Sequence, residues 1–213
     1  MNKITIIDYG MGNVKSVFRA VEKMGGKPIV TNDPAVVTES KKIILPGVGS
    51  YSFGMKELRK RKLDTAIHEA IKKNASLLGL CLGMQMLFEE SNENEKTKGL
   101  DLIKGKVIKI PNERDNKNLR KIPHIGWNKV YSSNKMMWNS SILKDVEENE
   151  YFYFVHSYYV RPEKESDIVG FCEYLDLKIP SIVMKNKIFG IQFHPENSCD
   201  QGLKIYQNFI SLS

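Results

Sequence analysis

Residues 76–85 read Ser76-Leu77-Leu78-Gly79-Leu80-Cys81-Leu82-Gly83-Met84-Gln85. An apolar run comes first, a cysteine follows between two glycines, and an amphipathic segment comes next. This order is typical of a buried strand that turns sharply into a helix. Gly79 and Gly83 flank Cys81 as in a nucleophile elbow, where small neighbours permit the strained turn that presents the nucleophile. We therefore predict that Cys81 is a nucleophile, and a structural cysteine buried in a tight turn is the alternative.

The first half of the chain alternates short apolar runs with segments of helical periodicity. The runs predict strands over residues 4–7, 28–30, 42–45 and 76–80. Helices are expected between them, over 14–24 with a stop at Gly25-Gly26, over 54–73 and over 82–89. Strands that alternate with helices pair in parallel and are covered on both faces, so the predicted fold class is α/β.

The second half is richer in strand patterns. Strands are predicted over residues 107–110, 127–131, 151–159, 168–174, 181–184 and 188–193, with a hairpin-like break at 185–187. A last helix would begin after a cap at Ser198 or Asp200. The polar segments 90–98 and 112–121 are expected to be exposed loops. Neither repeats nor a linker divide the chain, so residues 1–213 are predicted to form a single domain.

Composition and charge narrow the class of protein. No apolar run approaches the roughly 20 residues that span a bilayer, and the N-terminal apolar run is too short for a secretion signal, so we expect a cytoplasmic protein. The three cysteines are an odd number without metal-ligand spacing, which favours a reducing compartment. The net charge of +7 comes from scattered lysines and arginines that are densest at 56–62. A solvated helix face, or a surface for an acidic protein, explains them better than nucleic acid does.

A histidine and a carboxylate follow the last predicted strand. His194-Pro195-Glu196 comes directly after the apolar run 188–193. Open α/β sheets place their functional residues at the carboxyl ends of strands. There His194 would act as the base for Cys81, and Glu196 would hold the imidazole in one tautomer. For the motif in isolation, a hydrogen-bonded surface histidine is the alternative.

Two backbone segments are candidates for an oxyanion hole. The N–H of Leu82, directly after Cys81, would point at a developing oxyanion. Pro46-Gly47-Val48-Gly49-Ser50 follows the predicted strand 42–45, and its glycines free the backbone to present N–H groups to an anion. A simple strand-to-helix turn is the alternative. The segment is not a P-loop, because no Gly-Lys-Ser/Thr follows it.

Together these motifs resemble a known family. Residues 80–85 with residues 193–196 are similar to the motifs of class I (triad) glutamine amidotransferases. Within that family the chain resembles the glutaminase subunits of imidazole glycerol phosphate synthase, through Asp8-Tyr9-Gly10-Met11-Gly12-Asn13, Leu45-Pro46-Gly47-Val48-Gly49-Ser50, Pro123-His124-Ile125-Gly126-Trp127-Asn128 and Tyr153-Phe154-Val155-His156-Ser157-Tyr158-Tyr159. The resemblance implies the flavodoxin-like three-layer class I glutaminase fold, with a mostly parallel central sheet and additional antiparallel strands in the C-terminal half.

The resemblance also implies an activity and the residues that carry it. Glutamine would be hydrolysed to glutamate and ammonia without a metal or a cofactor. The catalytic triad would be Cys81, His194 and Glu196. The oxyanion hole would come from Gly47, Val48, Gly49 and Leu82, and the substrate would be seated by Gln85, Ser157 and Tyr158.

Family members work as heterodimers with a (β/α)8-barrel cyclase, which uses the ammonia to form imidazole glycerol phosphate in histidine biosynthesis. The resemblance places five residues near that partner: Asn13, Lys15, Trp127, Tyr153 and Asn197. Core packing is the alternative for Trp127 and Tyr153, and it is the preferred interpretation of Phe154.

Two positions depart from the family pattern. The family usually has a lysine where this chain has Asn197, and tends to have an arginine where this chain has Lys15. A related glutaminase that supplies ammonia for amidation of a surface-polysaccharide sugar is therefore an alternative. A non-catalytic binding subunit with a decayed site is a second one, and the intact triad argues against it.

The remaining histidines and cysteines have simpler interpretations. We expect His68 on the surface of a basic helix, and a structural or interface role for His124 and His156. Cys172 is interpreted as a small core residue and Cys199 as incidental.

Overall fold

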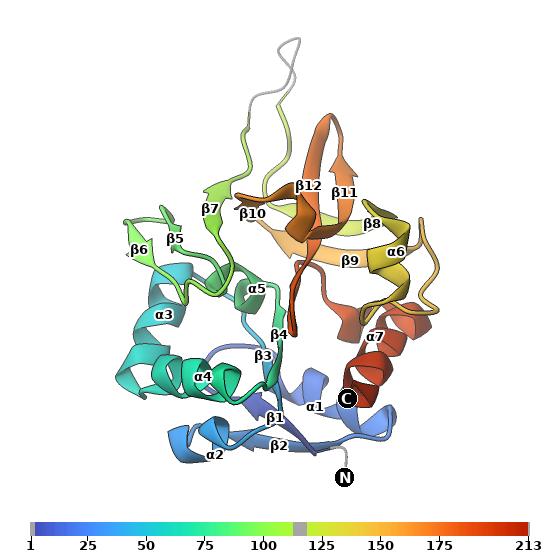
Figure 1. Cartoon of the computed structure of the whole chain (residues 1–213). Helices are drawn as coiled ribbons and strands as arrows, with labels where there is room; N and C mark the ends of the chain where they lie inside the picture. Colours follow the sequence, from blue (N-terminus) through green and yellow to red (C-terminus); the bar gives the residue numbers. More distant parts are fainter. Residues whose placement is uncertain (1–2, 113–118, 213) are drawn as a thin grey trace.

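Five parallel strands form the centre of the computed structural model, which describes residues 3–112 and 119–212 (Figure 1). They are β1 (Lys3–Ile7), β2 (Lys27–Thr31), β3 (Lys42–Leu45), β4 (Ser76–Leu80) and β13 (Ile188–Ile191). Their order is β2-β1-β3-β4-β13, and each strand is parallel to its neighbours. This is the strand order of the flavodoxin-like sheet. The predicted α/β class is confirmed.

Four antiparallel strands extend this sheet beyond β13. They are β12 (Leu177–Lys185), β11 (Ile168–Tyr174), β8 (His124–Ser132) and β9 (Tyr151–His156). The break predicted at 185–187 is the turn between β12 and β13, where Asn186 has a φ of 55°. A second sheet has the order β10-β7-β5-β6 and consists of β10 (Tyr158–Pro162), β7 (Gly105–Lys109), β5 (Glu90–Ser91) and β6 (Thr97–Lys98).

Helices cover both faces of the parallel strands (Figure 1). On one face, α1 (Val14–Lys23) and α7 (Cys199–Ser211) contribute side chains such as Val17, Val21 and Phe209 to one apolar cluster. On the other face, α3 (Tyr51–Lys60), α4 (Leu63–Lys72) and α5 (Leu82–Met86) contribute Met55, Ile67 and Met84 to a second cluster. The architecture therefore has three layers with the sheet in the middle.

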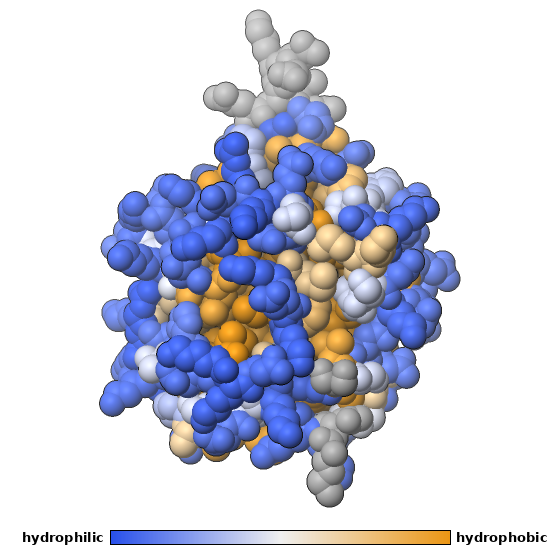
Figure 2. Space-filling view, in the orientation of Figure 1, coloured by the Kyte–Doolittle hydropathy of each residue, from blue (hydrophilic) through white to orange (hydrophobic). Residues whose placement is uncertain are grey.

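Several short elements complete the fold. The helices α2 (Pro34–Thr38) and α6 (Lys135–Asn139) were not predicted, and neither were the 3-10 turns η2 (Glu165–Asp167) and η3 (Pro195–Asn197). No helix in the described part of the chain is long and apolar enough to cross a membrane. Figure 2 shows apolar residues near the middle of one face, surrounded by hydrophilic side chains.

The helix predicted over residues 54–73 is wrong as one element. The structure has α3 and α4 separated at Arg61 and Lys62, because Lys62 adopts the left-handed conformation with φ 57° and ψ 21°. The predicted helix 82–89 is likewise shorter, since α5 ends at Met86. Apolar periodicity continues across the break at Lys62, and for this reason the sequence pattern did not predict two separate helices.

The strand predicted over residues 151–159 is also two elements. β9 ends at His156 and β10 begins at Tyr158, and the two strands belong to different sheets. The segment 90–98 is not only loop, because it contains β5 and β6, whose Glu90 forms ion pairs with Lys96 and Lys106. Of the predicted loop 112–121, residues 113–118 lie outside the described part.

Candidate active site

Three segments meet at the carboxyl ends of neighbouring parallel strands. β3 leads into residues 46–50, β4 leads into Cys81, and β13 leads through Gln192 and Phe193 into His194. Because β3, β4 and β13 are adjacent in the sheet, these segments come together at one edge. The structure therefore gathers three motifs that lie apart in the sequence, with His194 more than a hundred residues after Cys81.

Cys81 occupies a strained turn between β4 and α5. Its φ of 51° and ψ of −107° lie outside the regions that non-glycine residues normally adopt. A Cβ atom on Gly83 would come within 1.9 Å of the carbonyl oxygen of Leu45, and one on Gly79 within 2.7 Å of the carbonyl carbon of Gly83. Glycine is required at both positions because the start of α5 lies directly against β3 and β4.

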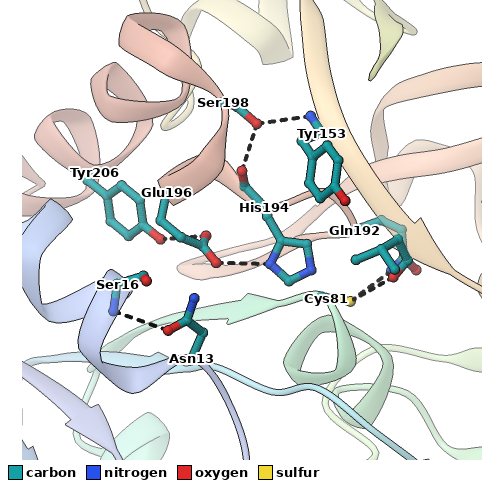
Figure 3. A network of polar contacts seen from close by, with 10 residues as sticks. Asn13, Ser16, Cys81, Tyr153, Gln192, His194, Glu196, Ser198 and Tyr206 are labelled. Atoms are coloured by element: carbon teal, nitrogen blue, oxygen red, sulfur yellow. Dashed lines mark hydrogen bonds and ion pairs between the residues drawn. The ribbon is translucent and has the colours of Figure 1, made fainter. Parts of the chain in front are cut away.

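His194 lies between Cys81 and Glu196 (Figure 3). Its Nδ1–H donates to Oε1 of Glu196 at 2.9 Å, and Oε2 of Glu196 accepts from the hydroxyl of Tyr206 at 3.2 Å. A carboxylate can only accept, so the hydrogen is on Nδ1 and the neutral imidazole has Nε2 free to take a proton. Glu196 thus selects the tautomer that a general base needs.

Ser198 holds the backbone of this segment. Its Oγ donates to the carbonyl of His194 at 2.6 Å and accepts from the N–H of Tyr153 at 3.0 Å. The predicted capping role is wrong in this respect: Ser198 stands at the N-cap position of α7, but its side chain makes no cap hydrogen bond. The hydroxyl instead connects the His194 segment to β9.

The charge state of His194 is set by its two neighbours. Burial lowers the pKa of His194, but interactions with Cys81 and Glu196 outweigh burial and raise the pKa to about 10. Its Nε2 is buried and makes no hydrogen bond of normal geometry to a described residue. The site therefore favours an imidazolium whenever the neighbouring sulfur carries negative charge.

The thiol of Cys81 has two further polar neighbours. Its Sγ donates weakly to the carbonyl of Val155 at 3.9 Å, and Nε2 of Gln192 donates to Sγ at 3.6 Å. The sequence did not lead us to Gln192. The available signal was a polar residue inside the apolar run 188–193, where Gln192 is completely buried.

The expected oxyanion donors adopt a closed arrangement. The N–H of Leu82 donates to the carbonyl oxygen of Gly47 at 3.3 Å, so it does not point into open space beside Cys81. Val48 and Gly49 are exposed and line the same pocket, and Gly49 has a φ of 99°. The four predicted residues are therefore together, but in this conformation the Gly47 carbonyl occupies the Leu82 donor.

A pocket of about 280 Å³ opens beside the thiol. Its lining includes all three predicted substrate residues, Gln85, Ser157 and Tyr158. Glu93 adds a carboxylate, which is held in place because Oε2 accepts from the N–H of Tyr51 at 2.6 Å. Sequence reasoning missed Glu93 because segment 90–98 was expected to be an exposed loop.

The predicted partner residues lie in two places. Trp127 is 50% exposed, its ring lies edge-on to that of Tyr153 at 6.0 Å, and the neighbouring Ile125 and Val155 are also exposed, so β8 and β9 carry an apolar surface. Asn13, Lys15 and Asn197 are exposed near the ends of α1 and η3. The Oδ1 of Asn13 accepts from the N–H of Ser16 at 3.4 Å and caps α1.

The inner face of β8 and β9 is different. Phe154 is fully buried, which confirms its prediction as a core residue. His124 lies stacked between the rings of Phe154 and Tyr174, with centroids 4.9 Å and 4.0 Å away. Its Nδ1 is 3.0 Å from Nε2 of His156, and burial lowers the pKa of His124 to about 4 and that of His156 to about 3. Both histidines are therefore neutral near pH 7.

The other predicted residues lie apart from the pocket. Cys172 is fully buried in the apolar core, as predicted, and burial raises the pKa of its thiol to about 12. Cys199 is exposed at the start of α7, and His68 lies partly exposed on α4. Among the described residues, no group of three or more His, Cys, Asp or Glu side chains is placed to hold a metal ion.

Comparison with known proteins identifies the family of the chain. The model of the family described as glutamine amidotransferase class-I matches residues 5–212. A Geobacillus sp. (strain WCH70) protein named imidazole glycerol phosphate synthase subunit HisH is 43% identical over 209 residues, which are 98% of this chain and 96% of that protein. The protein of the same name from Methanocaldococcus jannaschii is 44% identical over 98% of this chain and 99% of its own length.

Solved structures agree on the fold. A structure described as a glutamine amidotransferase has a TM-score of 0.73 at 15% identity, and the match covers 98% of this chain and 99% of the other. PurLQS from Thermotoga maritima has a TM-score of 0.69 at 17% identity, with 97% and 96% covered. At these identities the likeness supports the architecture alone.

Proposed function

The chain belongs to the class I glutamine amidotransferases and, within them, to the HisH subunits of imidazole glycerol phosphate synthase. From this we propose which residues of the pocket carry out the reaction. The enzyme hydrolyses glutamine to glutamate and ammonia, and the ammonia is used to form imidazole glycerol phosphate in histidine biosynthesis. One observation carries the assignment of the site: Cys81 and the Glu196-bound His194 converge on a common pocket from adjacent strands.

Cys81 acts as the nucleophile in this proposal. Its thiolate attacks the side-chain carboxamide carbon of glutamine, while His194 donates its proton to the departing nitrogen. Ammonia leaves and a glutamyl thioester remains on Cys81. His194 then takes a proton from water, which cleaves the thioester and releases glutamate. Glu196 stabilises the imidazolium in both steps, as its 2.9 Å hydrogen bond to Nδ1 allows.

The oxyanion hole has to be opened before this chemistry. The N–H of Leu82 is engaged by the Gly47 carbonyl at 3.3 Å, so it is unavailable to a tetrahedral intermediate. We propose that the segment Gly47–Gly49 turns so that this carbonyl leaves and a backbone N–H replaces it. The glycines at 47 and 49 make such a turn accessible. In this proposal, the arrangement with the Gly47 carbonyl on the Leu82 N–H is the resting state of the subunit.

The lining of the pocket fits the polar groups of glutamine. The carboxylate of Glu93 matches the α-ammonium group of the amino acid. Ser157 and Tyr158 lie where the chain passes from β9 to β10, and their polar groups would orient the remaining groups of the substrate. Gln85 lines the same pocket, with its side-chain nitrogen donating to the Tyr158 carbonyl at 2.9 Å.

A second subunit completes the proposed enzyme. The relatives are named as subunits of a synthase, and we propose that this chain likewise binds a (β/α)8-barrel cyclase that receives its ammonia. The exposed apolar surface of Ile125, Trp127 and Val155 is a suitable docking area. Asn13, Lys15, Tyr153 and Asn197 are proposed to lie around it.

A glutaminase assay tests the site assignment. Glutamate release is measured with the chain assembled with its cyclase partner, and Cys81→Ala is expected to lower the rate by at least about 10³-fold, because the covalent route is lost. Cys199→Ser is the matched control, since Cys199 is exposed outside the pocket lining, and it should keep the wild-type rate.

Retention of activity in Cys81→Ala would refute the nucleophile assignment. The destination of the ammonia is tested separately, by identifying the protein that co-purifies with the chain. A sugar-amidating partner in place of a histidine-pathway cyclase would support the alternative that the departure at Asn197 raised.

A further inference from the structure

Gln192 is completely buried beside the nucleophile, and the triad chemistry assigns it no role. Its Nε2 lies 3.6 Å from Sγ of Cys81. An amide N–H that points at sulfur favours the thiolate over the thiol, because hydrogen bonding to the charged form stabilises that form. A donor already in place also needs no reorganisation when the charge develops.

The orientation of Gln192 follows from hydrogen bonds that begin at a backbone carbonyl. The carbonyl oxygen of Tyr158 can only accept, and it receives an N–H of Gln85 Nε2 at 2.9 Å. The second hydrogen of that nitrogen goes to Oε1 of Gln192 at 3.1 Å. With Oε1 held there, Nε2 of Gln192 faces Cys81. A flipped amide would place an oxygen against the sulfur and two NH₂ groups against each other.

The histidine pair anchors the same carbonyl from the other side. Nδ1–H of His156 donates to the Tyr158 oxygen at 2.9 Å, which leaves Nε2 of His156 as an acceptor. That atom accepts from Nδ1–H of His124 at 3.0 Å, and Nε2 of His124 accepts from Nδ2 of Asn128 at 3.4 Å. These contacts leave one possible tautomer for each of the two histidines. The series of hydrogen bonds therefore runs in one direction, from Asn128 to the Tyr158 carbonyl.

We propose that Gln192 is a positioning residue that holds the Cys81 thiolate through its amide, in an orientation imposed by Gln85 and the Tyr158 carbonyl. The inference rests on the proposed role of Cys81 as the nucleophile. The titratable groups around the sulfur are His194 after β13, Tyr9 after β1, His156 on β9 and Glu93 in the pocket lining. Gln192 is not titratable, and its amide donates directly to the sulfur at 3.6 Å.

Thiol reactivity tests this role without requiring glutamine or the partner. The full-length chain is alkylated with iodoacetamide from about pH 5 to about pH 9, and the peptide that contains Cys81 is quantified by mass spectrometry. Gln192→Met keeps the length of the side chain and removes the donor. We expect Cys81 in this variant to react about tenfold more slowly near pH 7, with the whole rate–pH curve displaced to higher pH.

Three further variants test whether the hydrogen-bond donor of Gln192 is responsible, rather than its shape or an added charge. Gln192→Glu is isosteric and turns a carboxylate oxygen toward the sulfur, so the reaction should be slower still as that carboxylate ionises. Gln207→Glu adds the same charge at an exposed position of α7 and should leave the curve unchanged. Gln85→Met removes the group that orients Gln192, and it should shift the curve in the same direction as Gln192→Met.

The outcomes distinguish this inference from the proposed function. An unchanged rate–pH curve in folded Gln192→Met overturns the inference, whatever the glutaminase assay shows. If Gln192→Met does not fold, unchanged curves in Gln192→Glu and Gln85→Met overturn it equally. Full glutaminase activity in Cys81→Ala would instead refute the proposed function, even if the alkylation curves move as expected.

Discussion

The protonation state of His194 depends on Cys81 and on Glu196, and Glu196 also fixes its tautomer. It accepts from His194 Nδ1 at 2.9 Å and from the Tyr206 hydroxyl at 3.2 Å, and it is almost completely buried. The negative charge and the tautomer requirement act together, because a carboxylate both stabilises the imidazolium and accepts only the Nδ1 hydrogen. Replacement of the charge alone should therefore be more harmful than loss of the Tyr206 hydroxyl.

Glu196→Gln tests this argument. The amide can donate to Nδ1, which leaves the hydrogen on Nε2 and removes the base, so kcat for glutamate release should fall by about 10²- to 10⁴-fold with a smaller change in KM. Tyr206→Phe is the matched control, since it keeps the carboxylate, and it should cost less than about tenfold. Equal losses in the two variants would show that the charge of Glu196 is not the decisive property.

The sequence was sufficient to predict that Cys81 and His194 come together, but it did not lead to two of the residues around them, Glu93 and Gln192. Cys81 and His194 each follow an apolar strand, so their meeting at one edge of a parallel sheet could be predicted from local patterns. Glu93 and Gln192 carry no such local mark. Glu93 reaches the pocket from a segment that was expected to be a loop, and Gln192 lies directly after β13 in the predicted apolar run 188–193, whose pattern predicts only burial.

At the level of elements, the junction of α3 and α4 has a single strained residue. Lys62 is exposed and adopts φ 57° and ψ 21°, a conformation that costs an L-residue with a Cβ atom about 1 kcal/mol or more and costs glycine almost nothing. We expect Lys62→Gly to raise the free energy of unfolding by about 0.5 kcal/mol, after subtraction of the greater entropy of glycine in the unfolded chain.

Urea denaturation of a pair of variants checks this expectation. Lys56→Gly replaces an exposed lysine inside α3, where φ is helical, and it should lower the free energy of unfolding by about 1 kcal/mol. Opposite signs for the two substitutions would establish that conformation at Lys62, and not loss of a lysine, is responsible. Destabilisation by both would contradict the argument.

The helices and strands also show which parts of the fold local sequence patterns can predict. The parallel strands were predictable because each is marked by a local run of apolar residues, and α1 was predictable from its helical periodicity. The division of residues 151–159 between two sheets was not, because β9 pairs with β8 while β10 pairs with β7, and such distant pairings leave no trace in local periodicity. The same applies to β5 and β6, which have two residues each.

At the scale of the whole molecule, buried neutral histidines determine the response to acid. The pKa of His124 is lowered to about 4 and that of His156 to about 3, against about 6.5 for histidine in an unfolded chain. Between those values the unfolded chain binds more protons than the native one, so stability falls as the pH falls. His194 has the opposite shift, and its contribution is complete below about pH 6.5 and is lost as the pH rises toward about 10.

Lowering the pH from about 7 to about 5 should therefore reduce the free energy of unfolding by about 3 kcal/mol, because unfolding takes up about one proton on average over this range and roughly two near pH 5. Carboxylates add little to this change, because the lowered pKa values of Glu57, Glu69, Glu89 and Glu90 place their effect on stability below about pH 4.5.

Urea denaturation at a series of pH values measures how steeply the free energy of unfolding depends on pH. His124→Phe keeps an aromatic ring between Phe154 and Tyr174 and should lower the slope by about one proton near pH 5. A stability that is flat over this range, or an unchanged slope in His124→Phe, would mean that the pair takes up protons in the native state, and the one-directional hydrogen-bond chain to the Tyr158 carbonyl could not then be maintained.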